Sequence, residues 1–527
     1  MSAALTTLDL GWLTSLPGLA TIFGTYVLGL SFYRLYLSPL AGIPGPKIAA
    51  LTSLYNAYHD LFANGGGHYI WVVEDMHRRY GPIVRIRPDV VHVNDPAFIE
   101  QLYSQSPRVR RERYATVLGM AQNPGSILGT KDHDMHRRRR AVLNPLFSQA
   151  NVRRLEPIIN DTLTNLFGRM DGWARQGEPV GFNDPLRAAT KDIIQAYAFG
   201  QGGPKYLDME DCNKPFFDVV GPQPISHLST HTLLLSKLLQ KMPPALMIRL
   251  IPRVAVFIEY ALDIHAQIDA LRGAKDLPEG RTIFHEILTS DIPESEKQTK
   301  RLGEEALIMV IAGSDTTAST LACIMYHVLA DRELLRRLKA ELETVMPNPD
   351  DLPAASKLES LTLLNAIIQE AIRLYPGATH RQDRMAPDED LVYTNPDSGT
   401  TYVIPRGYGI GMTAPLVNRH PSIYYRPNDF LPERYIENKK LDKYLFSFSK
   451  GTRQCIGINL AYQELQSFTA GIFRKYSLYD PDKGENGQGG PTLELFETTR
   501  RDITMHADCV TPKLPPGSQG LRLRIRN

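Results

Sequence analysis

The chain has 527 residues, of which 43% are hydrophobic and 22% charged, a composition typical of a folded globular protein. Its net charge of +2 gives no general attraction to nucleic acid, and no basic run alternates with aromatic residues, so we expect no nucleic-acid partner. The four cysteines are too widely spaced for a disulfide framework or a zinc site, which favours a reducing, cytosol-facing location.

The first segment is predicted to be a membrane anchor. No charged residue lies between Asp9 and Arg34, which is long enough for a transmembrane helix over about residues 12–33. Arg34 and Lys47 follow it, so the positive-inside rule leaves the rest of the chain in the cytosol. The alternative, a cleaved signal peptide, is disfavoured because no basic segment precedes the apolar stretch. We expect an anchor over 1–37, a proline-rich hinge over 38–47 and one catalytic domain over 48–527.

Within that domain the apolar spacing predicts mostly helix with small sheets, a mainly α fold of the α+β class. Two short strands around a Pro-Asp turn are expected over 80–94. Helices are expected over 150–172, 184–199, 255–272 and 303–347, the last broken by Pro347 and Pro349. Strands are expected again near 391–413 and from 495 to the end.

Three segments before the C-terminal part carry unusual polar residues. In the arginine-rich segment 134–148, His136 and Arg140 stand one helical turn apart, with His133 as a competing histidine. The helical run 304–329 contains Ala312-Gly-Ser-Asp-Thr-Thr317, a poor choice for a helix interior; such a conflict tends to mark a functional site. The alternative is a surface acid beside a packed threonine.

Glu370 and Arg373 lie three residues apart on one predicted helix face, surrounded by apolar residues. Most such pairs are exposed and contribute little, but this one is expected to be buried and therefore to need further partners.

The segment Phe448-Ser-Lys-Gly-Thr-Arg-Gln-Cys-Ile-Gly457 describes a cysteine suited to binding haem iron. Gly451 and Gly457 allow a tight turn that directs amide N–H groups at the sulfur, and Phe448 offers an aromatic wall. Arg453 offers a planar cation for a carboxylate. The alternative reading of Cys455 is a simply buried cysteine.

The spacing Phe-x-x-Gly-x-Arg-x-Cys-x-Gly resembles the haem-binding loop of the cytochrome P-450 superfamily. The other landmarks follow the family's order over 34–527, and the segments 38–47 and 80–88 resemble fungal secondary-metabolism members, including the trichodiene-oxygenase-like group. The resemblance implies haem b with Cys455 as the axial ligand of the iron, and proton delivery by Thr316 and Asp315. It also implies propionate donors His136, Arg140, Arg381 and Arg453, and a structural cluster of Glu370 and Arg373 completed by Arg434.

The activity implied is insertion of one oxygen atom from O2 into a lipophilic small molecule, by hydroxylation or epoxidation. Electrons would come from NADPH through cytochrome P-450 reductase, with cytochrome b5 as an additional candidate, at the endoplasmic reticulum membrane. The rivals are a haem-thiolate isomerase, dehydratase or peroxide-using enzyme that needs no reductase, and a haem-based sensor.

The substrate is expected to be a neutral terpenoid or polyketide-derived skeleton, because the lining inferred for the pocket carries few fixed charges and an apolar, proline-rich cap over 215–262 suits lipophilic molecules. The pocket residues expected are Tyr114, Met309, Ala312, Thr379, His380 and Val510.

Overall fold

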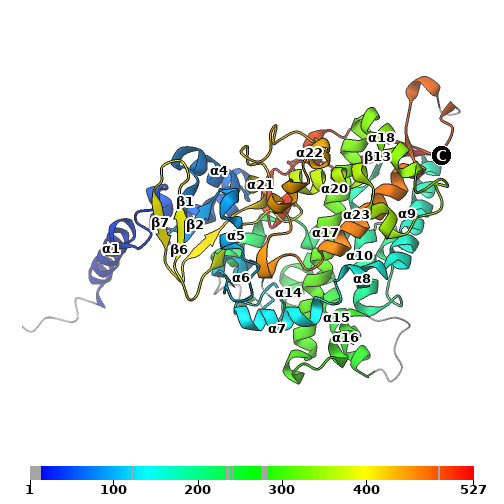
Figure 1. The fold of residues 1–527 in the computed structure, drawn as a ribbon. Coiled ribbons are helices and arrows are strands. Elements are labelled where there is room, and N and C mark those ends of the chain that lie inside the picture. Colours follow the sequence, from blue (N-terminus) through cyan, green and yellow to red (C-terminus); the bar gives the residue numbers. More distant parts are fainter. Residues whose placement is uncertain (1–13, 122, 233–237, 240, 274–281, 485–486) are drawn as a thin grey trace, which may run out of the picture.

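The fold is seen in a computed structural model, which describes residues 14–121, 123–232, 238–239, 241–273, 282–484 and 487–527 (Figure 1). The start of the expected anchor and residues 233–237 of the expected cap lie outside the described residues. Helices predominate on one side of the molecule and the largest sheet lies on the other, nearer the N-terminal helix. This is the mainly α architecture with small sheets expected from the sequence.

The helices of the first half of the chain are α1 (Leu16–Phe32), α2 (Lys47–Leu51), α3 (Leu54–Leu61), α4 (Tyr69–Tyr80), α5 (Ile99–Leu102), α6 (Ala115–Ala121), α7 (His133–Leu143), α8 (Gln149–Arg153), α9 (Glu156–Gln176), α10 (Asn183–Phe199), α11 (Lys214–Val220), α12 (Leu228–His231), α14 (Pro244–Leu250) and α15 (Ala255–Gly273). Those of the second half are α16 (Ile283–Thr289), α17 (Thr299–Ala330), α18 (Arg332–Glu343), α19 (Ala355–Glu359), α20 (Thr362–Leu374), α21 (Ala414–Val417), α22 (Glu433–Glu437) and α23 (Ile458–Lys475).

Helix α17 is the centre of the core. It packs against α10, α15, α20 and α23, and its apolar residues belong to the largest buried cluster. Its length and composition would suit a membrane span, but most of it is buried inside the protein. The helix expected over 303–347 is in fact two, because Asp331 ends α17 and its carboxylate accepts N–H bonds from Glu333 and Leu334 at the start of α18.

The helix expected over 150–172 is likewise divided, into α8 and α9, whereas α10 and α15 match their predicted ranges closely.

The five-stranded sheet has the order β1-β2-β8-β5-β3 and the four-stranded sheet the order β4-β13-β10-β9. Two further pairs, β6-β7 and β11-β12, form two-stranded sheets. The strands of all four sheets are β1 (Ile83–Arg87), β2 (Val90–Val93), β3 (Glu112–Arg113), β4 (Val180–Gly181), β5 (Arg384–Met385), β6 (Leu391–Thr394), β7 (Thr401–Ile404), β8 (Gly409–Gly411), β9 (Ser477–Leu478), β10 (Thr492–Leu495), β11 (Ala507–Cys509), β12 (Thr511–Lys513) and β13 (Arg522–Arg526). The pair predicted over 80–94 is confirmed: β1 and β2 are antiparallel around Pro88 and Asp89.

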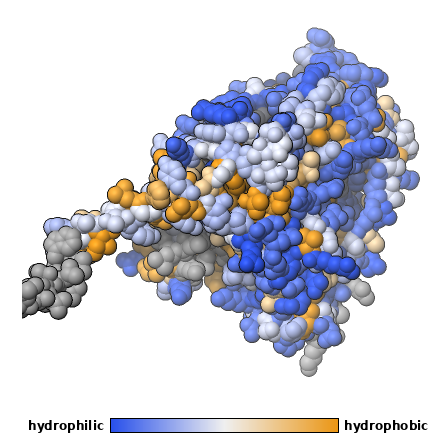
Figure 2. Space-filling view, turned by 60° about the vertical axis from the view of Figure 1, so that its left-hand side comes forward, coloured by the Kyte–Doolittle hydropathy of each residue, from blue (hydrophilic) through white to orange (hydrophobic). Residues whose placement is uncertain are grey.

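Helix α1 projects from the body, and Figure 2 shows hydrophobic side chains along this arm and on the adjoining face. With the following π-helical turn it forms a candidate membrane span over Leu16–Leu37. The proline-rich segment after it is irregular, as predicted, but it is not a free hinge. Leu40 is fully buried, and the Arg85 amide donates to the Pro44 carbonyl at 2.7 Å while its guanidinium donates to the Arg34 carbonyl at 2.7 Å. The connector is therefore packed onto strand β1.

Candidate active site

The cysteine loop holds Cys455 deep within the protein, yet this residue keeps an accessible surface. Cys455 lies between the 3-10 turn Gly451–Arg453 and helix α23, and its amide donates to the Phe448 carbonyl at 2.9 Å. Its Sγ accepts the N–H of Gly457. Burial raises the pKa of the Cys455 thiol, whereas the Gly457 N–H and nearby Arg140 act in the opposite sense. The other three cysteines are buried.

The two glycines of the loop have different purposes. Gly451 has φ +77°, and a Cβ there would lie 2.5 Å from the Tyr103 carbonyl oxygen, so only glycine fits. Gly457 has an ordinary backbone, and a Cβ there would meet no atom within 4 Å. The expected tight turn therefore requires Gly451 alone, and Gly457 leaves open space two residues from the cysteine. Phe448 packs against Tyr462, with ring centroids 5.7 Å apart.

Four arginines and a neutral histidine gather near this loop. The charges of Arg113, Arg140, Arg384 and Arg453 all lower the pKa of His136, and none of the four arginines has an ion-pair partner among the described residues. Burial and the surrounding arginines together lower the pKa of His136 to about 2, so this imidazole is neutral. Uncompensated buried arginines are costly unless they bind anions. The cluster fits a group with two carboxylates, as haem has.

Arg453 and Arg140 already have protein partners. Arg453 donates to the carbonyls of Arg111 at 3.2 Å, Thr130 at 2.6 Å and Lys131 at 2.6 Å, which ties the cysteine loop to the segments before α7. Arg140 donates to the Gln454 carbonyl at 2.5 Å. Four of the five N–H groups of Arg453 donate to carbonyls, so this side chain holds the loop in place. Its role as a propionate donor stays a prediction.

Arg381, expected to be a further propionate donor, is directed elsewhere. It forms a buried ion pair with Asp60 at 3.1 Å, and its guanidinium lies 5.1 Å from the centroid of the Tyr69 ring. Arg384 and Arg113 are the cations that the sequence analysis missed. Strands β3 and β5 pair these two residues directly across the sheet. Both strands are only two residues long, too short for any periodic signal in the sequence.

The competing histidine, His133, is buried with Nδ1 near the Arg111 backbone, and its Nε2 has no partner among the described residues.

Helix α17 places Thr316 and Asp315 on different sides. The Thr316 hydroxyl, which is exposed, donates to the Ala312 carbonyl at 2.9 Å. The Asp315 carboxylate accepts from the Arg187 guanidinium of α10 at 2.6 Å. Although the segment 312–317 is a poor choice for a helix interior, α17 is continuous from Thr299 to Ala330, and its hydroxyls bond to carbonyls of preceding turns. A Cβ on Gly377 would lie 2.7 Å from the Thr316 Cβ, so the chain after α20 reaches Thr316 only because residue 377 is glycine.

Glu370, Arg373 and Arg434 are brought together, all with at most 2% exposure. The Glu370 carboxylate accepts two bonds from Arg373, at 2.7 and 2.8 Å, and one from Arg434 at 3.1 Å. The arginines' other N–H groups donate to the carbonyls of Asn418, Pro427 and Tyr425. The pair was expected to be buried and to have a third partner, and the structure has this arrangement.

The expected pocket residues divide into three groups. Ala312 is exposed in the middle of a largely buried part of α17, and His380 and Val510 are half-buried. Val510 has φ +78°, a strained value for a β-branched residue. Met309 and Thr379 are buried, and the Thr379 hydroxyl donates to Asp508 at 2.8 Å. Tyr114 lies against the sheet, with its hydroxyl donating to Asp89 at 2.6 Å, so its place in the pocket is not supported.

The comparison with known proteins decides the family: the cytochrome P450 model matches residues 54–493. The chain belongs to the cytochrome P450 family. It is 37% identical over 530 residues to cytochrome P450 monooxygenase tpcC of Cochliobolus heterostrophus, covering 100% of this chain and 99% of that one. It is 34% identical over 513 residues to N-acetyltryptophan 6-hydroxylase ivoC of Emericella nidulans, covering 95% of each. The crystal structure of a cytochrome P450, CYP102L1, superimposes with a TM-score of 0.67 at 19% identity, covering 87% of this chain and 94% of that one.

The P450 family implies haem as the cofactor, and the residues found here fit it. The exposed thiol of Cys455 and the open space at Gly457 suit an axial ligand beside a flat ring, and the buried cations suit its carboxylates. The protein is a P450 monooxygenase of the kind found in fungal secondary metabolism.

Proposed function

We propose that this P450 inserts one oxygen atom from O2 into a neutral, lipophilic natural product as a tailoring step, using electrons from NADPH delivered by cytochrome P450 reductase. The observation that carries the proposal is the accessible Cys455 thiol, held by the Gly457 N–H beside buried cations that lack carboxylate partners. Cytochrome b5 is a second candidate donor. A terpenoid or polyketide-derived skeleton is the substrate class that we propose.

The chain's own residues have separable roles. Bound haem supplies O2 activation, which thiolate ligation favours. Cys455 provides the ligand, and the Gly457 N–H tempers the charge on its sulfur. Arg113, His136 and Arg384 bind the propionate carboxylates.

On the α17 side, the Thr316 hydroxyl and the Asp315 carboxylate move protons toward the reacting oxygen, and Arg187 orients that carboxylate. Arg187 had no signal in the sequence, since it reaches Asp315 from a different helix.

The placement in the cell follows from the N-terminal arm. We propose a single-pass anchor over 1–37, a connector over 38–47 and a cytosolic catalytic domain over 48–527 at the endoplasmic reticulum membrane. The support is the exposed apolar surface of α1, including Leu16, Phe23 and Leu28, with 84%, 68% and 74% exposure. Phe62 and Ile225 are further large apolar side chains exposed on the body.

The test uses full-length protein with haem in lipid nanodiscs. The reduced, carbon-monoxide-bound protein should show the red-shifted Soret band of thiolate ligation, and Cys455→Ala should abolish it while Cys212→Ala, at a buried cysteine, retains it. Product from candidate terpenoids or polyketides should require both NADPH and reductase. Turnover without reductase would instead identify the isomerase, dehydratase or peroxide-using alternative, and a complete lack of turnover with any substrate would favour a sensor.

A further inference from the structure

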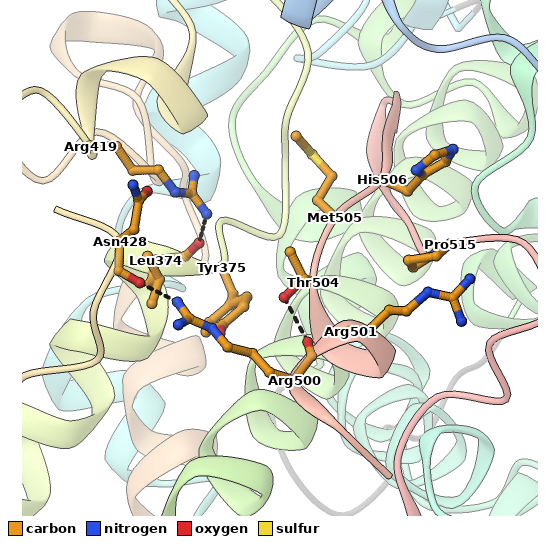
Figure 3. A pocket seen from close by; sticks show the side chains of 10 residues that line it. All are labelled: Leu374, Tyr375, Arg419, Asn428, Arg500, Arg501, Thr504, Met505, His506 and Pro515. Atoms are coloured by element: carbon orange, nitrogen blue, oxygen red, sulfur yellow. Dashed lines mark hydrogen bonds between the residues drawn. The ribbon is translucent and has the colours of Figure 1, made fainter. Parts of the chain in front are cut away.

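A cavity of about 490 Å³ lies outside the site described above. It opens to the surface and is lined by the end of α20, the loop after α21, the 3-10 turn Arg500–Ile503 and the segments on either side of the β11-β12 hairpin (Figure 3). Its volume is within the range of small-molecule pockets, ~300–1,000 Å³. None of its lining residues belongs to the cysteine loop or to the cation cluster near it.

The cavity is strongly basic. Arg419, Arg500 and Arg501 line it, no aspartate or glutamate does, and none of the three has a carboxylate within 4.0 Å among the described residues. Burial, together with the positive charges of Arg373 and Arg500, lowers the pKa of Arg419 to about 10, and Tyr375 and Glu74 act in the opposite sense. Glu74 and Asp502 are the acids that act on these arginines from outside the lining, and neither forms an ion pair with them within 4.0 Å.

Each arginine keeps donors for a ligand. Arg419 donates to the Pro415 carbonyl at 3.1 Å and to the Leu374 carbonyl, Arg500 to that of Asn428, and Arg501 to that of Pro516 at 2.8 Å. A guanidinium has five N–H groups, so these carbonyls fix the side chains without exhausting them. In Figure 3, Arg419 and Arg500 lie on the side of Leu374 and Tyr375, and Arg501 lies across the space beside Pro515.

The rest of the lining combines the polar residues Asn428, Thr504 and His506 with four residues that offer apolar surface. Leu374 and Tyr375 are buried side chains at the end of α20, and Met505 and Pro515 face them from the C-terminal segment. An aromatic ring and a proline on opposite sides suit a flat hydrocarbon body, and methionine adapts to different shapes.

We propose that this cavity binds an organic anion that has a flat apolar body and one carboxylate, sulfonate or phosphate group. The apolar body lies between Tyr375 and Pro515, and the anionic group accepts hydrogen bonds from Arg500, Arg419 or Arg501. Such charge-assisted bonds give specificity for anions over neutral analogues of the same shape. The site goes beyond the proposed oxygenation, because its ligand does not approach Cys455.

The test is calorimetric titration of the full-length, haem-loaded protein in phosphatidylcholine nanodiscs, with the haem site saturated by a bulky azole that coordinates the iron. The probe is 2-naphthoate, and the matched neutral compound is 2-naphthamide. We expect 2-naphthoate to bind about tenfold more tightly. Arg500→Gln should remove this preference. Arg501→Gln, at an exposed residue that makes fewer contacts, should reduce it and guards against misfolding of the first variant.

The control is Arg336→Gln, which removes an exposed arginine of α18 far from the cavity lining and should leave binding unchanged. Equal affinity for the two naphthalene compounds, or a preference that persists in both cavity variants, would overturn the proposal. Repeating the titration in discs that contain phosphatidylserine separates two sources of the anion. If phosphatidylserine weakens the binding of 2-naphthoate, and this competition disappears in Arg501→Gln, the natural ligand is a lipid headgroup. If phosphatidylserine leaves the binding of 2-naphthoate unchanged, the natural ligand is a soluble metabolite.

Discussion

Replacing Glu370 by Gln should destabilise the protein severely. Among the described residues, the Glu370 carboxylate is the only side-chain acid that forms ion pairs with the buried Arg373 and Arg434. Arg373 is 0% exposed and Arg434 2%, so neither can regain water when the negative charge is lost. The new amide would also place an N–H donor against a guanidinium that has only donors. Removing one partner of a buried ion pair typically costs ~3–5 kcal/mol, a large part of a total stability of ~5–15 kcal/mol.

The chain contains a matched control for this experiment. Glu333 and Arg336 are also three residues apart on a helix and also contact at 2.7 Å, but their side chains are 60% and 68% exposed. Glu333→Gln should therefore leave the denaturant midpoint and the haem content unchanged. Chemical unfolding followed by circular dichroism, with haem content from the carbon-monoxide spectrum, compares the two variants. If Glu370→Gln were no more destabilised than Glu333→Gln, the argument from burial would be refuted.

Two further perturbations test the α17 side and the anchor. Arg187→Gln should release the Asp315 carboxylate from its 2.6 Å ion pair. The amount of product formed per NADPH should then fall and the amount of peroxide should rise, because proton delivery by a positioned group typically contributes ~10²–10⁴-fold to the rate. Lys214→Gln, at the exposed edge of the same charge cluster, is the control, and unchanged coupling in Arg187→Gln would exclude this role for Arg187. Deletion of residues 1–37 should release the protein from membranes with its haem spectrum intact. Retention on membranes after the deletion would show that the body binds them by itself.

Sequence reasoning can find features that depend on a local pattern. The cysteine loop, the Thr316 segment and the Glu370 pair each combine residue types that are unfavourable without a specific purpose, and such conflicts are visible in the chain itself. The buried contact of Glu370 with Arg373 and Arg434 is confirmed, whereas the roles of Cys455 and Thr316 stay predictions. The ranges of α10 and α15 were also predictable from their apolar spacing. The buried residues of α15 lie four apart, at Tyr260, Ile264 and Ile268, whereas α10 is buried on most sides.

The same reasoning failed where partners come from distant segments. Arg381 and Arg384 are three residues apart, and only the fold shows that Asp60 pairs with Arg381 while strand β3 brings Arg113 to Arg384. Likewise, nothing in the sequence indicated that Arg187 reaches Asp315. A propionate donor is a property of tertiary contacts, so a cationic residue near a motif is not sufficient to identify it.

Lys191 shows how far such tertiary contacts extend, because it is a fully buried cation that the sequence analysis did not single out. Its Nζ lies 3.7, 3.5 and 4.2 Å from the ring centroids of Tyr206, Phe216 and Tyr260 and has no hydrogen-bond partner among the described residues. Burial lowers the pKa of this ammonium to about 7, with Asp192 acting in the opposite sense. The cation–π contacts offset only part of the desolvation cost.

The direction of the pH effect follows from this depressed pKa. Between pH 7 and the ordinary lysine value of ~10.4, the unfolded chain binds a proton at this residue that the folded protein does not. The contribution of Lys191 to the free energy of unfolding is therefore favourable at high pH and is lost as the pH falls toward 7. At ~1.4 kcal/mol per pKa unit, the gain from pH 7 to pH 9 is about 2 kcal/mol. Lys191→Met should remove this gain from denaturant unfolding curves, whereas Lys214→Gln, at an exposed residue, should keep it. If Lys191→Met retained the wild-type slope, the ammonium would be charged in the fold at both pH values, and the three rings would outweigh the desolvation cost.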